Sequence, residues 1–208
     1  MYTKEIMVLT IALITAGASA GDVYLSEADL IAEMGAGYTH NDFSSVSDGA
    51  VDSLDYDFGT FAYEITTGPI PTSGLYNEGG VISTASNFDS IVINFTSGNV
   101  HAIGANVWAT DPGFDPAGAL MLVTLSDGTV EAFPSGGPSA FYGYTSDMII
   151  TSVEIRAVGF LSPRYATMDN LYAGTTGDYP IVPLPPAAWA GIGMLGLMSP
   201  AVLRGTST

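Results

Sequence analysis

The feature that most constrains the fold of this chain is a two-residue alternation of apolar and polar side chains, repeated in short segments. In residues 90–96, the side chains of Ile91, Ile93 and Phe95 share one face, and residues 151–157 alternate in the same way. Successive side chains of a β-strand point to opposite faces, so this period predicts strands that bury one face and expose the other.

A β-hairpin is predicted within residues 119–133, because Asp127 and Gly128 suit a two-residue turn whose central residues need positive φ. Connections rich in Gly, Pro, Asn and Ser separate the alternating segments. Further strands are expected at residues 60–66, 80–85, 100–109, 140–144 and 167–173. Many short strands at regular spacing predict an all-β fold, an antiparallel β-sandwich.

One short helix is expected at residues 26–34. Ser26 can cap its N-terminus, and Leu30, Ile31 and Met34 recur at the spacing of a single apolar helix face. No internal repeat of solenoid or propeller length is present in the sequence.

The N-terminus, residues 1–20, has the parts of a secretory signal peptide. Lys4 supplies a positive charge, residues 6–16 form an apolar run too short to span a bilayer, and small residues follow at 18–20. We expect cleavage between Ala20 and Gly21, which leaves residues 21–177 as the sandwich domain.

The C-terminal segment, residues 178–208, combines a proline-rich stretch with a hydrophobic one. Residues 187–203 carry no charge, and as a helix they would reach only about 25 Å at about 1.5 Å per residue, less than a hydrocarbon core of about 30 Å. Arg204 follows this marginal span and favours a cytoplasmic end. The preceding stretch excludes helix because its prolines lack amide donors; it consists of Val182, Pro183, Leu184, Pro185 and Pro186.

This order of proline motif, short span and basic residue resembles the PEP-CTERM class of sorting signals, in its VPLPA-type variant. The resemblance covers about residues 181–204; here the motif reads VPLPP before Ala187, and a single Arg204 replaces the usual arginine cluster. It implies export by signal peptidase, transient anchoring in the inner membrane, cutting by an exosortase, and release to the cell surface or extracellular matrix of Gram-negative bacteria. A plain single-span anchor is the alternative.

The middle of the chain also resembles the globular part common among PEP-CTERM proteins. The similar stretches between residues 61 and 174 read VHAIGANVWATD, VTLSDGT, FYGYTSD, ITSVEIRA and TMDNLYAG. This resemblance implies a jelly-roll-like sandwich, similar to galactose-binding-like modules, and brings no established activity with it.

The charge of the chain excludes one class of partner. The formal net charge is −17, and residues 21–181 contain 20 acidic and 2 basic residues, hence a charge of −18. Affinity for nucleic acid depends mainly on Lys and Arg, so we expect no nucleic-acid partner. Cysteine is absent, so neither a disulfide, a thiolate metal site nor a cysteine nucleophile can form.

Catalytic motifs are absent from the sequence: it contains no nucleophile elbow, zinc motif, phosphate loop or dinucleotide fingerprint. His101 is expected to be a packed or rim histidine. No catalytic or cofactor-binding residue is therefore predicted. Calcium is the candidate cation, because it prefers carboxylate and carbonyl oxygens; the candidate ligands are Asp111, Asp169 and Asn170, and a solvated acidic surface is the alternative.

Three functions are considered for an exported domain of this kind, of which we expect the first and keep the other two as alternatives. The first is a non-catalytic structural or adhesive protein, the second a carbohydrate-binding module for exopolysaccharide, and the third a secreted glycoside hydrolase. An exposed aromatic platform beside a groove would favour the second, and the candidate aromatic residues are Trp108, Tyr142 and Tyr144. Convergent carboxylates in a deep cleft would favour the third, and a smooth sandwich would leave the first.

Overall fold

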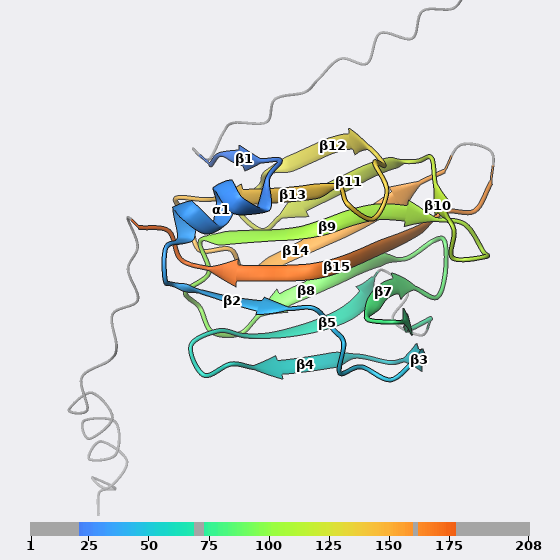
Figure 1. Ribbon diagram of the computed structural model, residues 1–208, viewed down its shortest axis with the longest axis horizontal. Coiled ribbons are helices and arrows are strands. Elements are labelled where there is room, and N and C mark those ends of the chain that lie inside the picture. The colour runs from blue at the N-terminus through green and yellow to red at the C-terminus, as the bar shows by residue number, and fades with distance from the viewer. Residues whose placement is uncertain (1–20, 69–72, 160–161, 178–208) are drawn as a thin grey trace, which may run out of the picture.

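The structure is a computed structural model that describes residues 21–68, 73–159 and 162–177. These residues form two antiparallel β-sheets that pack face to face, with one short helix on the outer side (Figure 1). The prediction of an all-β antiparallel sandwich is confirmed.

The predictions for the two ends lie outside the described residues. These are the signal peptide with Ala20, the proline motif at 182–186, the hydrophobic helix at 187–203, and Arg204. Gly21, the expected first residue after cleavage, is the first residue described. Within the described part, no helix is long and apolar enough to cross a membrane.

The larger sheet has nine strands among the described residues. Its order is β1-β13-β9-β15-β7-β6-β3. In addition, β2 pairs with residues 171–174 of β15, C-terminal to the residues of β15 that pair with β7, and β10 pairs with the end of β9. The strands are β1 (Val23–Tyr24), β2 (Tyr38–Asn41), β3 (Gly49–Val51), β6 (Leu75–Glu78), β7 (Val81–Thr84), β9 (Ala102–Thr110), β10 (Pro116–Ala117), β13 (Phe141–Thr145) and β15 (Tyr165–Gly174).

The smaller sheet has six strands in the described part, in the order β12-β11-β14-β8-β5-β4. They are β4 (Leu54–Asp57), β5 (Ala62–Gly68), β8 (Ser90–Phe95), β11 (Leu120–Leu125), β12 (Val130–Pro134) and β14 (Ser152–Val158). From β7 onward the chain repeatedly crosses between the sheets, entering the smaller one at β8, β11 and β14 and the larger one at β9, β13 and β15. This alternation gives the sandwich its jelly-roll-like connectivity.

The hairpin between β11 and β12 forms where it is predicted, but its turn is of another kind. Gly128 has φ 98°, whereas Asp127 is not among the residues with positive φ. The Gly128 amide donates to the Leu125 carbonyl at 3.1 Å, and Asp127 Oδ1 accepts from the Thr129 amide at 2.8 Å. The expectation that both central residues need positive φ is therefore wrong: one left-handed glycine closes this longer turn.

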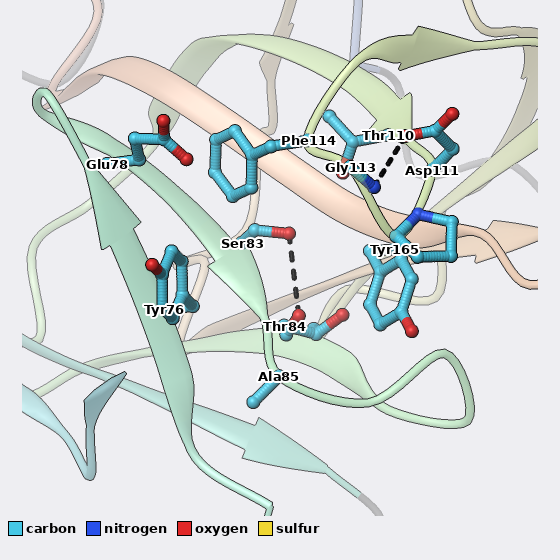
Figure 2. Close-up of a pocket in the computed structure, with 11 residues that line it drawn as sticks. Tyr76, Glu78, Ser83, Thr84, Ala85, Thr110, Asp111, Gly113, Phe114 and Tyr165 are labelled. Atoms are coloured by element: carbon cyan, nitrogen blue, oxygen red, sulfur yellow. Dashed lines mark hydrogen bonds between the residues drawn. The ribbon is translucent and has the colours of Figure 1, made fainter. Parts of the chain in front are cut away.

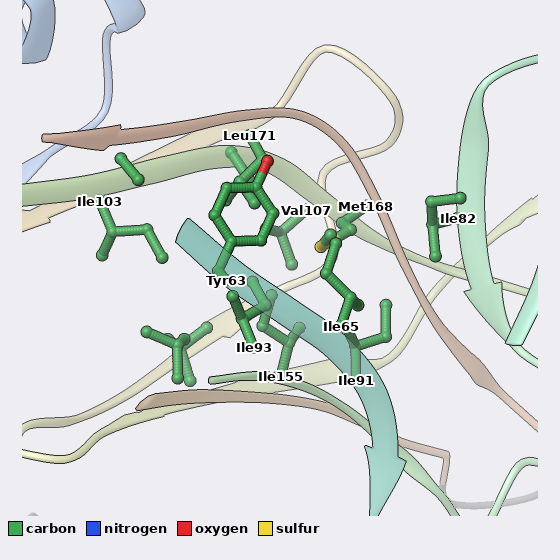
Figure 3. Packing of buried hydrophobic residues seen from close by; sticks show 14 of the residues in the cluster. Tyr63, Ile65, Ile82, Ile91, Ile93, Ile103, Val107, Ile155, Met168 and Leu171 are labelled. Atoms are coloured by element: carbon green, nitrogen blue, oxygen red, sulfur yellow. The ribbon is translucent and has the colours of Figure 1, made fainter. Parts of the chain in front are cut away.

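The core lies between the two sheets and is built from the faces that the alternation predicts (Figure 3). Ile91 and Ile93 of β8 are completely buried, opposite Ile155 and Val153 of β14. Phe95 continues the same face and is 6% exposed. The buried face predicted for each of these two strands is confirmed.

The helix α1 (Glu27–Met34) lies on the outer face of the larger sheet, above β9 and β13 (Figure 1). Leu30 and Met34 are buried there, as the helical pattern predicts. Ser26 occupies the N-cap position, but its side chain makes no capping hydrogen bond, which corrects the expected cap. Gly143 of β13 gives the helix room, because a Cβ atom there would lie 2.9 Å from Leu30 Cδ2.

Candidate functional site

The described structure contains a cleft of about 310 Å³ on the outer face of the larger sheet (Figure 2). The end of β9 and strand β7, which contribute to its lining, lie at the end of the sheet away from α1 (Figure 1). It lies between β6, β7, the start of β15 and the loop that joins β9 to β10. Its volume is at the lower end of the range of roughly 300–1,000 Å³ found for ligand pockets. The lining includes Tyr76, Glu78, Ser83, Thr110, Asp111, Phe114 and Tyr165.

Aromatic rings form the walls of this cleft. Tyr76 of β6 is 39% exposed, and its ring centroid lies 5.8 Å from that of Phe114, at an interplanar angle of 57°. Figure 2 shows these two rings on one side of the cleft and Tyr165 on the other, with Ser83 between them. Tyr76, Phe114 and Tyr165 therefore present apolar ring surface to the cleft.

Phe114 is held in its position by a tight loop. Its φ is 66°, a left-handed conformation that costs a non-glycine residue about 1 kcal/mol or more. Asp111 stabilises the loop: its Oδ1 accepts hydrogen bonds from the Gly113 amide at 2.8 Å and the Asp115 amide at 3.2 Å. The Phe114 amide also donates to the Asp111 carbonyl at 3.0 Å. The loop therefore fixes an unfavourable backbone conformation that places an aromatic ring at the cleft.

Ser83 and Thr110 line the floor of the cleft, and the hydroxyl group of the fully buried Thr167, which is not part of the lining, joins theirs. Thr167 of β15 lies between Ser83 of β7 and Thr110 of β9, and its Oγ1 is 3.1 Å from Ser83 Oγ and 3.0 Å from Thr110 Oγ1. All three residues are buried. Their mutual hydrogen bonds make the floor polar and fixed, since each rotor is held by its neighbours.

Carboxylates add negative charge to the rim of the cleft. Glu78 is exposed at the end of β6, and Asp111 is half-buried in the β9–β10 loop. Neither Arg156 nor Arg164, the only basic residues in the described part, belongs to the lining. The cleft is therefore an acidic, aromatic-walled surface with a hydroxyl floor.

The candidate calcium ligands fall in two separate places. Asp169 lies opposite Asn106 of β9, whereas Asp111 lies five residues further along the chain, beyond the end of that strand. At about 3.3 Å per residue the two are roughly 16 Å apart, so they do not form one site. Among the described residues, no group of three His, Asp or Glu side chains is placed to hold a metal ion.

Asp169 and Asn170 form a β-bulge within β15, where the register against β9 shifts and Asn170 has φ 52°. The Asn170 side-chain amide donates to Asn106 Oδ1 at 3.1 Å and to Asp169 Oδ2 at 3.1 Å. His40 Nε2 lies 3.1 Å from Asn170 Oδ1. Burial raises the pKa of the Asp169 carboxyl, and the charge of Asp42 adds to that rise. The bulge is thus a polar network that satisfies its own members.

The three aromatic residues that were candidates for a sugar platform do not form an exposed one. Trp108 is 3% exposed and Tyr144 is 4% exposed, while the half-buried Tyr142 stacks on Phe133 with ring centroids 3.5 Å apart. Aromatic residues of strands more often pack in the core, and Trp108 and Tyr144 do so here. The rings at the cleft are instead Tyr76 and Phe114. A signal for Phe114 was present in the sequence, since an aromatic within Asp-Pro-Gly-Phe-Asp interrupts an otherwise polar turn.

His101, expected to be a packed or rim histidine, lies directly before β9 and is 9% exposed. Its Nδ1 lies 3.1 Å from the Ser146 carbonyl oxygen. It lies outside the cleft lining.

Comparisons with known proteins add little to this geometry. No protein-family model matches the chain, and no curated protein matches it. A solved structure with partial similarity is a mutant of CBM29-2, from a study of ligand recognition by family 29 carbohydrate-binding modules. It shares 13% sequence identity over 72% of this chain and 100% of that chain, with a TM-score of 0.39.

Proposed function

We propose that this protein is a non-catalytic carbohydrate-binding protein that acts at the cell surface or in the extracellular matrix. The observation that carries this proposal is the pair of rings, Tyr76 and Phe114, beside an open cleft with a hydroxyl floor. The apolar C–H face of a sugar stacks on such rings, while its hydroxyl groups bond to the carboxylates and carbonyls around them. An adhesive role in the matrix would follow from glycan binding.

The charge of the protein favours a neutral or amino-bearing sugar. Glu78 and Asp111 line the cleft, and residues 21–181 have a formal charge of −18. Polymers rich in uronic acid or sulfate would be repelled by this field at low ionic strength. Carboxylates are good acceptors for sugar hydroxyls and would pair with a protonated amine. The expected ligand is therefore a neutral hexose polymer or an amino sugar.

Binding is tested with the full-length protein on an array of neutral, amino and acidic polysaccharides. On the best ligand, Phe114→Ala and Tyr76→Ala should each weaken binding about tenfold, equivalent to about 1.4 kcal/mol. Phe88→Ala is the matched control, because Phe88 is 65% exposed and lies outside the cleft lining. An equal loss in the control and the cleft variants, or binding only of acidic polymers, would contradict the proposal.

A catalytic role is tested in the same samples. Asp111 Oδ1 is engaged by two amides of its own loop, which supports a positioning role for this carboxylate rather than a part in hydrolysis. We therefore expect no release of reducing ends from the bound polysaccharide during prolonged incubation. Release that disappears in Glu78→Gln would identify a hydrolase instead.

Export and sorting are part of the same proposal. The N-terminal pattern and the PEP-CTERM-like tail support processing by signal peptidase and an exosortase, so the mature protein should begin at Gly21 and lack the stretch after Ala187. Intact-mass measurement on protein recovered from the native cell surface tests this. A dominant species that retains residues 194–203 would indicate a plain membrane anchor.

A further inference from the structure

A second polar feature lies inside the sandwich, apart from the rings of the cleft. Asp89 directly precedes β8 and is 1% exposed. Both of its carboxylate oxygens are enclosed, and neither has a hydrogen-bond partner in the described part of the chain. A buried carboxylate without a partner is strongly unfavourable as an ion, so its presence in a folded domain requires a physical reason.

Two threonine hydroxyl groups at the same end of the sandwich are, like the Asp89 carboxylate, buried without a hydrogen-bond partner in the described part. Thr67, near the end of β5, pairs with Ile91, two residues after Asp89. Thr84 ends β7, and residues 85–88 join it to Asp89. The Oγ1 atoms of both threonines are buried without a hydrogen-bond partner among the described residues. Thr84 also contributes to the lining of the cleft, so the two features adjoin at this residue. Figure 1 shows β5 ending and β8 beginning at this end, beside β7.

We propose that Asp89, together with the Thr67 and Thr84 hydroxyls, binds a Ca²⁺ ion between the two sheets. A hard cation takes six to eight oxygen ligands from carboxylates, hydroxyls, carbonyls and water, so one ion supplies the partner that all three groups lack. Neither arginine of the described part supplies it: Arg164 bonds to the Gly118 and Pro163 carbonyls, and Arg156 lies exposed on β14.

The position of the site gives the ion a structural role. The link from β7 to β8 is a crossing between the two sheets, and Asp89 lies at its end. A cation bound there joins β5 and β8 of the smaller sheet to β7 of the larger one. With one carboxylate ligand the affinity should be modest, with a dissociation constant of about 0.1–1 mM, the range of extracellular calcium modules. The inference does not depend on glycan binding.

The experiment is equilibrium dialysis of the full-length protein against radioactive calcium, with melting temperatures measured in CaCl₂, MgCl₂ and NaCl at matched ionic strength. We expect one saturable Ca²⁺ per chain and a higher melting temperature in calcium than in the other two salts. Asp89→Asn should weaken calcium binding about tenfold or more, because charge on the ligands sets the affinity. Asp55→Asn is the matched control, since Asp55 is exposed on β4 and the charge change is identical.

Thr67→Val keeps the shape of the side chain and removes only the hydroxyl, so it serves as the second variant if Asp89→Asn does not fold. It should weaken calcium binding while the Asp55→Asn control does not. Absence of saturable binding by the wild type would overturn the proposal. Equal responses to calcium and magnesium, or equal affinities in the Asp89→Asn or Thr67→Val variant and in the control, would overturn it as well, because they indicate diffuse screening by the acidic surface.

Discussion

The substitution Ile93→Ala tests the packing of the sandwich at its centre. Ile93 is completely buried in β8, opposite Val153 of β14 on one side and Ile65 of β5 on the other. The change removes three carbon atoms from a side chain that lies in the core, on a strand with a neighbour on each side (Figure 3). At about 0.8 kcal/mol for each buried carbon group, the transfer contribution is about 2.4 kcal/mol.

The cavity left behind adds to this loss, because strands hydrogen-bonded on both sides collapse only in part. The total should be about 3–4 kcal/mol, within the range of about 2–5 kcal/mol for such truncations. For a protein of this size, each kcal/mol lowers the melting temperature by about 2–4 °C, so the shift should be roughly 6–16 °C.

The assay is urea denaturation of the full-length protein, followed by far-ultraviolet circular dichroism, with Ile149→Ala as control. Ile149 is 45% exposed, so the same chemical change should lower the free energy of unfolding by less than about 1 kcal/mol. The reasoning is refuted if the two variants lose the same stability, because Ile93 would then not be in the core.

Three further outcomes are expected. Gly104→Ala should lower the free energy of unfolding by about 1–3 kcal/mol, since its Cβ would collide with Leu30 and Phe141 beneath α1; Gly118→Ala, with open space around it, should not. Burial raises the pKa of Asp169 above the ordinary 3.8, so the folded state binds this proton more tightly than the unfolded state. The wild type should therefore gain stability relative to Asp169→Asn as the pH falls from 7 toward 4, as measured by urea unfolding at each pH. Asp111→Ala should weaken glycan binding about as much as Phe114→Ala, and the double variant should add little, in a double-mutant cycle of binding affinities.

The strands that the sequence predicts are those long enough to show a period. Residues 90–96 and 151–157 became β8 and β14 within one residue at each end, because each buries a continuous face against the opposite sheet. The shortest strands, β1, β3 and β10, have two or three residues and are too short to show any alternation. They form because a neighbouring strand presents backbone N–H and C=O groups that still need hydrogen-bond partners. Such groups become available only once the sheet has assembled, so the sequence of the short strand does not reveal them.

The bulge in β15 shows how a local exception arises. Met168 and Leu171 are both buried in the core although they lie three residues apart, so one extra residue must be accommodated between them. Asn170 takes this place with φ 52°, a conformation that asparagine tolerates better than most residues. The odd spacing of two apolar residues was visible in the sequence, but only the pairing with β9 shows that the chain bulges rather than ends its strand.

The cleft could not be predicted because its walls come from turns and strand ends rather than from a periodic element. Tyr76 is exposed on a four-residue strand, and Phe114 lies in a loop where no alternation applies. Asp111 was singled out for its carboxylate, and the structure gives that carboxylate a specific use in holding the loop. Since the loop keeps Phe114 in a left-handed conformation, its hydrogen bonds offset strain that a solvent-exposed turn has no need to carry. A ligand that contacts the Phe114 ring at a fixed position would account for this strain. Asp111, which the sequence offered as a cation ligand, would then contribute to binding by holding the loop that carries Phe114.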